Sequence, residues 1–598
     1  MDISPGVRYL IFTVIPETIT PIIAVCATIH YCVSYILPTF GKGVVVFLDA
    51  LVICISIKLY SIYNARQQAY LARQMNAIPV PIMRGPWGLP GNIDVLWGML
   101  KAFDEDYSGQ FQADLEDTWG DLYNFRVLGE DIIFTTNPAY VKQFLVTDFP
   151  NWIKGDDFIV PMKGLLGDGV FNSDGAMWKF HRSATRPFFA KERIVDFETF
   201  AKHAEGAILK IKERGGEPVD FQDIAGRFTM DSATSFLFGE SVDSMAAPLS
   251  LPHRSGANCG GSTSQQLGPA TTSFSSAFKT ALGAYAHRLF IGKVWPLWEI
   301  SGDKAKDSVR LLHEYIDPIV DRGLSRKGKL GSSAPKEVNC DIDDNATLLD
   351  HLVSVTDDKT VIRDELLNLL LAGRDTTSHA ITAVIYFLAT EDPSIMATLR
   401  KEILDVVGPG KVAPTFDQTK GMKYLRAVVN ETLRLMPSIP GNIRHSVEAS
   451  VWTNPSTGIR YYMPKHTRAA WSTLMMGRRK DLWGPDALIF DPMRWLDGRN
   501  KKYFLSNPFM FLPFHAGPRI CLGQQFALNE MSFFVTRLLQ NFGDISFAPD
   551  AFTPGTLPPP EWKANPFGRK AVEKAWPRSH LTMYFAGGLW LRMRETKS

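Results

Sequence analysis

The sequence lacks a disulfide framework, a charge bias and internal repeats, and each absence excludes a class of protein. Only six cysteines occur in 598 residues, at positions 26, 32, 54, 259, 340 and 521, and their spacing is not that of a disulfide-rich secreted domain. We therefore expect a reducing compartment around most of the chain. The formal net charge is only +2, so nothing in the charge implies a nucleic-acid partner.

Two long apolar runs stand at the N-terminus, at residues 19–40 and 43–63. A helix needs about 20 apolar residues to cross a bilayer, so each run is a candidate span. Asp49 in the second run would cost about 2.5–3.5 kcal/mol at the centre of a membrane, which leaves one or two spans open. Neither run ends in a small-residue cleavage site, which argues against a removable signal peptide. The alternative is a hairpin buried in a protein core.

Basic residues predict the orientation of these runs. Lys42 alone separates them, whereas Arg66, Arg73 and Arg84 follow the second. The positive-inside rule places the region after residue 63 in the cytosol. Two spans would form a tight hairpin with a cytosolic N-terminus.

Residues 78–91 are rich in proline, which makes the chain stiff and extended and cannot continue a helix. We interpret them as a hinge between a membrane anchor at residues 1–77 and one large domain at 92–598. The remaining length, roughly 500 residues, supplies enough material for a sizeable core.

Helical periodicity dominates the large domain, so its predicted class is mainly α with a small β-sheet region. A β-hairpin is expected at residues 122–136, and short strands near 459–463 and 581–593. Residues 246–272 predict a surface loop or disordered insertion, and 327–344 a polar linker. The apolar helix after the first of these segments contains three regularly spaced side chains, Phe274, Phe278 and Leu282.

The most specific pattern is at residues 514–523, which read Phe-x-x-Gly-x-Arg-x-Cys-x-Gly and lead into an apolar helical run. A thiol at a helix start, as at Cys521, is placed where the helix dipole favours the thiolate. Arg519 suits an anionic group of a cofactor, Gly517 permits a tight turn and Gly523 a close approach. A thiolate with one open side is what haem iron needs for O–O cleavage. An isolated cysteine would more often be structural, but five matched positions favour a ligand.

On this pattern the chain resembles the cytochrome P-450 haem-thiolate monooxygenases, and the resemblance covers residues 84–598. It implies the fold of that family, preceded by an N-terminal membrane anchor. It also implies haem b (iron protoporphyrin IX) bound through Cys521, with Phe514, Gly517, Arg519 and Gly523 forming the rest of the cofactor loop.

Residues 372–377 read Ala-Gly-Arg-Asp-Thr-Thr and lie in an apolar run at 365–388 that predicts a buried helix. The two small residues share a face with Thr376 and open a groove beside the helix, and Thr376 can donate to the carbonyl of Ala372. Asp375 supplies an acid beside this hydroxyl, which suits proton delivery. The resemblance identifies the segment as the oxygen-activation motif, with Thr376 and Asp375 catalytic. Taken alone, it would also fit a helix with a tolerated glycine.

Glu431 and Arg434 are three residues apart on a predicted helix and therefore meet on one face. The resemblance adds Arg494, from the segment Asp-Pro-Met-Arg-Trp at 491–495, and implies a structural triad that holds the cysteine loop. The family more often has Pro-Glu-Arg-Phe here, so this chain lacks a glutamate that could make a peripheral contact.

Trp178 and Arg182, four residues apart, share a helix face. In the resembled family this face reaches a haem propionate, and family position makes Arg444 another partner. With Arg519 these residues give three arginines for two carboxylates.

Two histidines adjoin these arginines. We expect His181 to lie on the surface, since it is beside an arginine on a polar helix face. Whether His445 assists Arg444 stays open.

The resemblance implies insertion of one oxygen atom from O2 into a C–H bond of a small apolar substrate, with electrons from NADPH. The chain contains no Rossmann or flavin segment, so the expected donor is a partner, NADPH–cytochrome P-450 reductase. The expected location is the endoplasmic reticulum membrane, in contact with membrane lipid and with the catalytic domain in the cytosol. Arg499, Lys501 and Lys502 could meet an acidic face of the reductase or form a solvated charge run.

The stretch at 517–530 resembles fungal members that hydroxylate alkanes, fatty acids and aromatic xenobiotics. Alternatives are a hydroxylase of a terpenoid or other secondary metabolite, an O2-independent isomerase or dehydratase, and a non-catalytic haem sensor or carrier. The Asp375–Thr376 pair argues against the isomerase, and the groove beside it against the sensor. Family position gives a set of apolar pocket candidates: Phe158, Met162, Leu165, Leu371, Ala372, Ile439 and Ile443.

Overall fold

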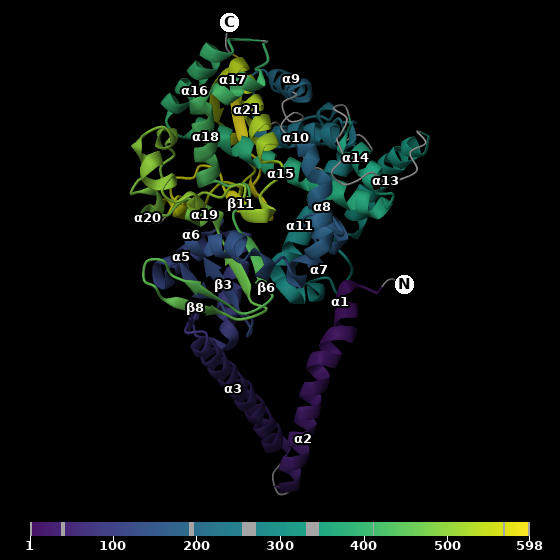
Figure 1. Cartoon of the computed structure of the whole chain (residues 1–598), viewed down its shortest axis with the longest axis vertical. Coiled ribbons are helices and arrows are strands. Elements are labelled where there is room, and N and C mark those ends of the chain that lie inside the picture. The colour runs from purple at the N-terminus through teal and green to yellow at the C-terminus, as the bar shows by residue number, and fades with distance from the viewer. Residues whose placement is uncertain are drawn as a thin grey trace.

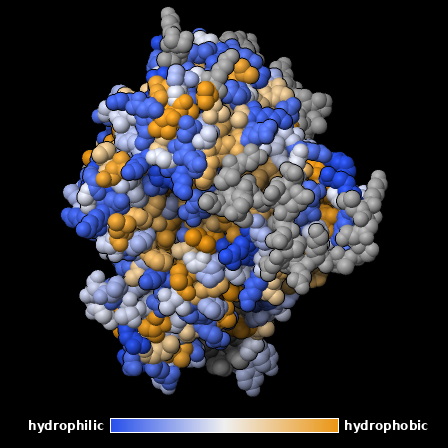
Figure 2. Space-filling model, turned by 45° about the horizontal axis from the view of Figure 1, so that its top comes forward, coloured by the Kyte–Doolittle hydropathy of each residue, from blue (hydrophilic) through white to orange (hydrophobic). Residues whose placement is uncertain are grey.

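The computed structural model describes residues 3–36, 42–189, 197–253, 271–329, 346–410, 412–565 and 568–595. Within these ranges helices dominate and short strands form small sheets, which confirms the predicted class (Figure 1). Polar and apolar residues are interspersed on the face shown in Figure 2.

The N-terminal part forms a helical hairpin that projects from the rest of the molecule (Figure 1). One arm consists of α1 (Pro5–Tyr9), a π-helical stretch (Leu10–Ile19) and α2 (Thr20–Ile36), and the other of α3 (Lys42–Gln74). Among the described helices, one segment, Val46–Gln74, is long and apolar enough to cross a membrane.

Both arms of the hairpin present large apolar side chains to the outside, and no part of the most apolar window of α3 is buried. The alternative of a hairpin buried in a protein core is therefore wrong. The exposed apolar side chains include Phe12, Ile23, Tyr31, Tyr35, Phe47, Leu59 and Tyr60.

The proline-rich segment at 78–91 begins extended and ends in a short 3-10 helix (Pro90–Asn92). Its first residues form β1 (Ile78–Pro79), which pairs in parallel with β8 (Arg460–Met463). The N–H of Asn124 then donates to the carbonyl of Pro81 at 2.9 Å. The segment is thus hydrogen-bonded into the large domain.

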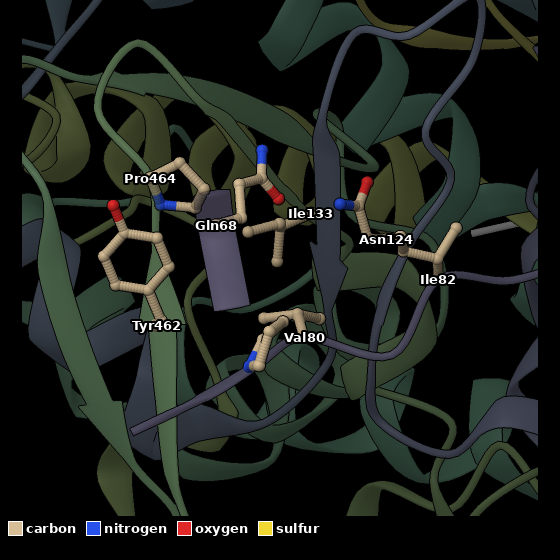
Figure 3. Close-up of a pocket in the computed structure, with 8 residues that line it drawn as sticks. Gln68, Val80, Ile82, Asn124, Ile133, Tyr462 and Pro464 are labelled. Atoms are coloured by element: carbon tan, nitrogen blue, oxygen red, sulfur yellow. The ribbon is translucent and has the colours of Figure 1, made fainter. Parts of the chain in front are cut away.

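A small pocket with about 250 Å³ of empty space marks the junction of α3 with the domain (Figure 3). The side chain of Gln68, one of its lining residues, donates to Asp131 Oδ2 at 2.9 Å. The pocket contains none of the predicted site residues. It is lined by Gln68, Pro79, Val80, Ile82, Asn124, Ile133, Tyr462 and Pro464.

The largest sheet has the strand order β2-β3-β9-β6-β4, and its first two strands are the predicted hairpin at 122–136. The strands predicted near 459–463 and 581–593 are also confirmed, as β8 and as β12 with β13. The sheets β1-β8-β7, β10-β13-β5 and β11-β12 complete the set described. The remaining strand bounds are β2 (Leu122–Asn124), β3 (Ile132–Thr135), β4 (Trp152–Ile153), β5 (Val219–Asp220), β6 (Asn442–Ser446), β7 (Ser450–Thr453), β9 (Arg468–Trp471), β10 (Phe542–Phe547), β11 (Pro577–Ser579), β12 (Met583–Phe585) and β13 (Trp590–Glu595).

The central helix is α15 (Lys359–Thr390), which extends beyond the predicted 365–388 at both ends. It packs against α10 (Phe221–Phe238), α18 (Lys423–Leu435) and α21 (Gln524–Asn541). The other helices are α4 (Ile93–Glu105), α5 (Gln110–Trp119), α6 (Pro138–Lys142), α7 (Asp156–Leu166), α8 (Gly175–Thr185), α9 (Glu198–Lys212), α11 (Thr271–Ile291), α12 (Trp295–Trp298), α13 (Lys306–Lys329), α14 (Leu348–Val355), α16 (Pro393–Val406), α17 (Phe416–Gly421), α19 (Thr473–Met476) and α20 (Lys480–Trp483).

Both predicted loops fall largely outside the described residues, since these omit 254–270 and 330–345. Residues 327–329, the described start of the expected linker, belong to α13, which continues to Lys329. The apolar helix expected after the first loop is α11, and its side chains Phe274, Phe278 and Leu282 are buried.

Candidate active site

The cysteine loop precedes α21, and Cys521 lies three residues before the first helical residue, Gln524. The N–H of Cys521 donates to the carbonyl of Phe514 at 3.0 Å, which closes the loop. Gly517 has a φ of +73°, and a Cβ there would lie 2.0 Å from the carbonyl oxygen of Leu145. Only glycine fits this turn.

The thiol of Cys521 is exposed, although enough protein surrounds it for burial to raise its pKa. The N–H of Gly523 and the charge of Arg182 act in the opposite direction, but the net pKa stays above the usual value. Burial therefore outweighs the Gly523 N–H and the charge of Arg182 at this thiol. A bound metal cation at the sulfur would supply the missing positive charge.

A group of cations gathers beside the loop around the carboxylate of Asp174. Arg519 donates to Asp174 Oδ1 at 2.5 Å and to the carbonyl of Ser173 at 3.0 Å, and its guanidinium lies 4.5 Å from the centre of the Trp178 ring. Arg444 is buried and donates to backbone and amide oxygens of its own strand. Lys154 is also buried, with its ammonium 3.8 Å from the centre of the Phe158 ring.

The pKa values show how crowded this positive charge is. Burial, with the charge of Arg519 second, lowers the pKa of Arg444 to about 9. Burial lowers the pKa of Lys154 well below its usual value, and Arg444 and Arg519 add to the shift. The same burial and the charges of Arg444 and Lys154 lower the pKa of His515 to about 3.

The donor set fits a cofactor with a metal ion and two carboxylates. Arg519 retains a buried Nε without a hydrogen-bond partner, and one carboxylate, that of Asp174, offsets the charges of Lys154, Arg444 and Arg519. Anionic groups would relieve both deficits, since a buried cation without a partner is costly. Haem b, with its iron and two propionates, has this composition.

On α15, the Thr376 hydroxyl donates to the carbonyl of Ala372 at 2.6 Å, the bond that the sequence predicts. The carbonyl of Thr376 in turn accepts a hydrogen bond from the hydroxyl of Ser438 at 2.7 Å, which fixes the segment before β6 to this turn. Asp375 is buried and forms an ion pair with Arg374. The two candidate catalytic residues are therefore adjacent, but the acid is engaged by its neighbour.

Glu431, Arg434 and Arg494 come together in a buried network. Arg434 binds both carboxylate oxygens of Glu431, at 2.8 and 2.7 Å, and Arg494 Nε lies 3.4 Å from Glu431 Oε1. The indole N–H of Trp495 and the backbone N–H of Asp491 also donate to Glu431, each at 3.0 Å. The three side chains are at most 1 % exposed.

The apolar pocket candidates come from three segments. Met162 and Leu165 on α7 and Leu371 on α15 are buried in one hydrophobic cluster, against which Phe158 packs. The candidates Ala372, Ile439 and Ile443 are half-buried. Ile439 follows Ser438, so it is adjacent to the Thr376 turn.

The expectation that His181 is a surface residue is wrong. It is 1 % exposed, and its Nδ1 lies 2.8 Å from Glu365 Oε2 on α15. The buried residues Trp178, His181 and Ala184 repeat every three residues on α8, and this period could have identified the buried face.

Lys154 and Asp174 were not singled out from the sequence, because no local motif marks them. His445 lies 3.7 Å from Asp157 through its Nε2. It follows Arg444 in β6, so its side chain points to the opposite face of the sheet.

The basic run before the cysteine loop is only partly available for a partner. Arg499 forms ion pairs with three carboxylates, those of Asp486, Asp491 and Asp497, at 2.5–2.7 Å. Lys501 and Lys502 are exposed.

Comparison with known proteins agrees with this site. The cytochrome P450 family profile matches residues 88–550, so the chain belongs to the cytochrome P450 family. It is 34 % identical to cytochrome P450 52E1 of Candida apicola over 504 residues, which cover 83 % of this chain and 91 % of that protein. It is 33 % identical to cytochrome P450 52A12 of Debaryomyces hansenii, over 77 % and 86 % of the two chains. It is 31 % identical to the cytochrome P450 monooxygenase pvhE of Talaromyces variabilis, over 76 % and 82 %.

Membership defines the chain as a cytochrome P450 monooxygenase with the fold of that family. The family uses haem and O2, with electrons from a redox partner.

Proposed function

We propose that this protein is a membrane-anchored monooxygenase of the endoplasmic reticulum that hydroxylates a fatty acid, alkane or other apolar substrate. It binds haem b through Cys521, and its electrons come from NADPH through NADPH–cytochrome P-450 reductase. The reaction balances as substrate, O2, NADPH and a proton giving the alcohol, water and NADP⁺.

The observation that carries the proposal is the exposed thiol of Cys521 beside a group of buried cations with one carboxylate. Bound haem would supply the activation of O2. Cys521 would bind the iron, while Arg444, Arg519 and Lys154 would face the propionates. The ring of Trp178 stacks against the Arg519 guanidinium. Phe514 and Gly517 fix the loop, and Gly523 places an N–H near the sulfur.

The roles of the α15 residues follow from their geometry. Because the Thr376 hydroxyl donates its proton to the Ala372 carbonyl, its oxygen lone pairs remain available to accept a proton or hydrogen bond. We assign Thr376 the role of accepting a hydrogen bond from the protonated reacting oxygen, which holds the proton there. We assign Asp375 the role of supplying the next proton. Exchange of the Arg374–Asp375 ion pair would precede each replacement.

The buried network of Glu431, Arg434 and Arg494 is assigned a structural role, since it is closed to solvent and has no contact with the thiol among the described bonds. The apolar side chains Met162, Leu165 and Leu371 suit an apolar substrate. The exposed apolar hairpin supports a membrane location, where such substrates concentrate. Lys501 and Lys502 are the exposed cations we assign to reductase contact.

The test is a screen for substrate-induced spin-state shifts with the purified protein, followed by turnover with NADPH and reductase. We expect long-chain fatty acids or alkanes to give the shift and a hydroxylated product with consumption of O2. A product formed without O2 from an already oxygenated substrate would contradict the proposal.

A further inference from the structure

The segment between α7 and α8, residues 167–173, is held against α15 by three hydrogen bonds from its backbone to side chains of α15. The N–H of Asp168 donates to Asp364 Oδ2 at 3.1 Å, and the N–H of Val170 to Glu365 Oε2 at 2.9 Å. The third acceptor, Asn368, lies one turn later on α15, and its Oδ1 accepts from the N–H of Phe171 at 3.0 Å. We call Asp364, Glu365 and Asn368 the acceptor triad.

The acceptor triad is buried: Asp364 is 6 % exposed, and Glu365 and Asn368 are 0 % exposed. Burying two carboxylates and an amide is costly unless they are hydrogen-bonded. Apolar residues at these positions would leave the N–H groups of the segment without acceptors, so the polar stripe serves to hold the segment. It accepts from three backbone N–H groups of the segment, and Glu365 Oε2 also lies 2.8 Å from His181 Nδ1 on α8.

Glycine makes the close approach of the segment possible. A Cβ on Gly167 would lie 1.8 Å from the carboxylate of Asp364, and a Cβ on Gly169 would lie 2.2 Å from Asn368 Nδ2. Asn368 also donates to the carbonyl of Leu166, the last residue of α7, at 2.7 Å. The acceptor triad thus fixes the end of α7 as well as the segment after it.

The segment joins the two parts of the candidate site. At its start it fixes α7, which carries Phe158, Met162 and Leu165. Beyond its last residue, the carboxylate of Asp174 holds Arg519 of the cysteine loop at 2.5 Å.

We propose that the acceptor triad consists of positioning residues that set the distance between α7 and α15, and thereby the length of the substrate pocket that the side chains of these two helices line. The proposal rests on the proposed function for the location of the pocket. It assigns a specificity role to side chains that need not touch the substrate.

The test uses Gly169→Ala, because the added methyl group must push the segment away from Asn368. The probes are N-methylimidazole and N-dodecylimidazole, whose nitrogen binds haem iron while the alkyl chain fills the pocket. We expect Gly169→Ala to weaken N-dodecylimidazole by about tenfold, the effect of displacing roughly one buried methylene. Binding of N-methylimidazole and the spectrum of the reduced carbon-monoxide complex should change little, whereas the melting temperature should fall, because overpacking a buried contact costs stability.

Two further variants complete the experiment. Gly421→Ala on α17 is the matched control, since a Cβ there meets nothing within 4 Å, and it should bind both probes normally. In an Asn368→Ala background the amide is gone, so Gly169→Ala should then cost less than about twofold.

Equal weakening of both probes, or loss of haem in Gly169→Ala, would overturn the proposal and leave the triad a purely structural role. Normal binding of both probes would also overturn it. If the unmodified protein hydroxylates no fatty acid or alkane, the proposed function fails, but the comparison of the two probes still reports on the pocket because it requires no turnover.

Discussion

Replacing Glu431 by alanine should destabilise the domain severely, because its carboxylate is the centre of the buried network. It accepts five hydrogen bonds, two from Arg434 and one each from Arg494, Trp495 and Asp491. Removing one partner of a buried ion pair typically costs about 3–5 kcal/mol, because it leaves an uncompensated charge. Here Arg434 and Arg494 would share that loss.

A loss of about 3–5 kcal/mol is a large part of the roughly 5–15 kcal/mol by which a domain is stable. We therefore expect Glu431→Ala to yield little folded, haem-containing protein, and Glu431→Gln to lie between it and the unmodified chain. The assay is denaturant unfolding together with the absorbance of bound haem. The control is Glu213→Ala, which removes an exposed carboxylate three residues from Lys210 and should cost less than about 1 kcal/mol.

The pH dependence of the same site has a definite sign. Burial alone would raise the pKa of Glu431, but Arg434 and Arg494 outweigh it and hold the pKa below its usual value. A carboxyl with a lowered folded-state pKa stabilises the fold above its unfolded pKa of about 4.3 and loses that contribution as the pH falls further. The reasoning is refuted if Glu431→Ala unfolds within about 1 kcal/mol of the unmodified protein. If it retains haem but turns over slowly, Glu431 acts in the chemistry.

Three further outcomes follow from the site and the anchor. Thr376→Ala should bind haem and substrate but divert electrons from NADPH to peroxide or water. Thr382→Ala removes a similar hydrogen bond to a backbone carbonyl further along α15 and should keep NADPH consumption coupled to product formation. Full coupling in Thr376→Ala would exclude the proton role. Lys154→Met should stabilise the haem-free protein, because it relieves crowding with Arg444. The same variant should lose haem faster, as measured by transfer of haem to apomyoglobin. If the stability of the haem-free protein and the retention of haem both rise or both fall, Lys154 lies outside the propionate site. A chain that starts at Ile78 should leave the membrane fraction at least partly but keep its haem spectrum. Its hydroxylation of a fatty acid in membranes should fall more than its haem content. Loss of haem would show that the hairpin is part of the fold of the domain.

Local patterns predicted the parts of the site that depend on local spacing. The Glu431–Arg434 contact follows from a separation of three residues on a helix, and the Thr376 back-bond from a separation of four. The hairpin at 122–136 follows from alternating apolar residues around a turn.

Long-range packing decided the parts that the sequence did not predict. Asp174 accepts a hydrogen bond from Arg519, which lies 345 residues later in the sequence. Neither its residue type nor its sequence neighbours indicate this contact. His181 was expected at the surface because it is next to Arg182, but its partner Glu365 belongs to a helix far along the chain. The local sequence at 78–91 also does not indicate the pairing of Ile78–Pro79 with β8, because that pairing depends on a strand nearly 400 residues later.

The central claim, that Cys521 is the ligand of haem iron, is tested most directly by Cys521→Ser. The matched control is Cys54→Ser, which changes an exposed cysteine on α3. The measurement is the absorbance spectrum of the reduced carbon-monoxide complex of each purified variant. We expect the red-shifted, thiolate-type Soret band in the unmodified protein and in Cys54→Ser, and its loss in Cys521→Ser. An unchanged band in Cys521→Ser would remove this residue as the ligand and contradict the account.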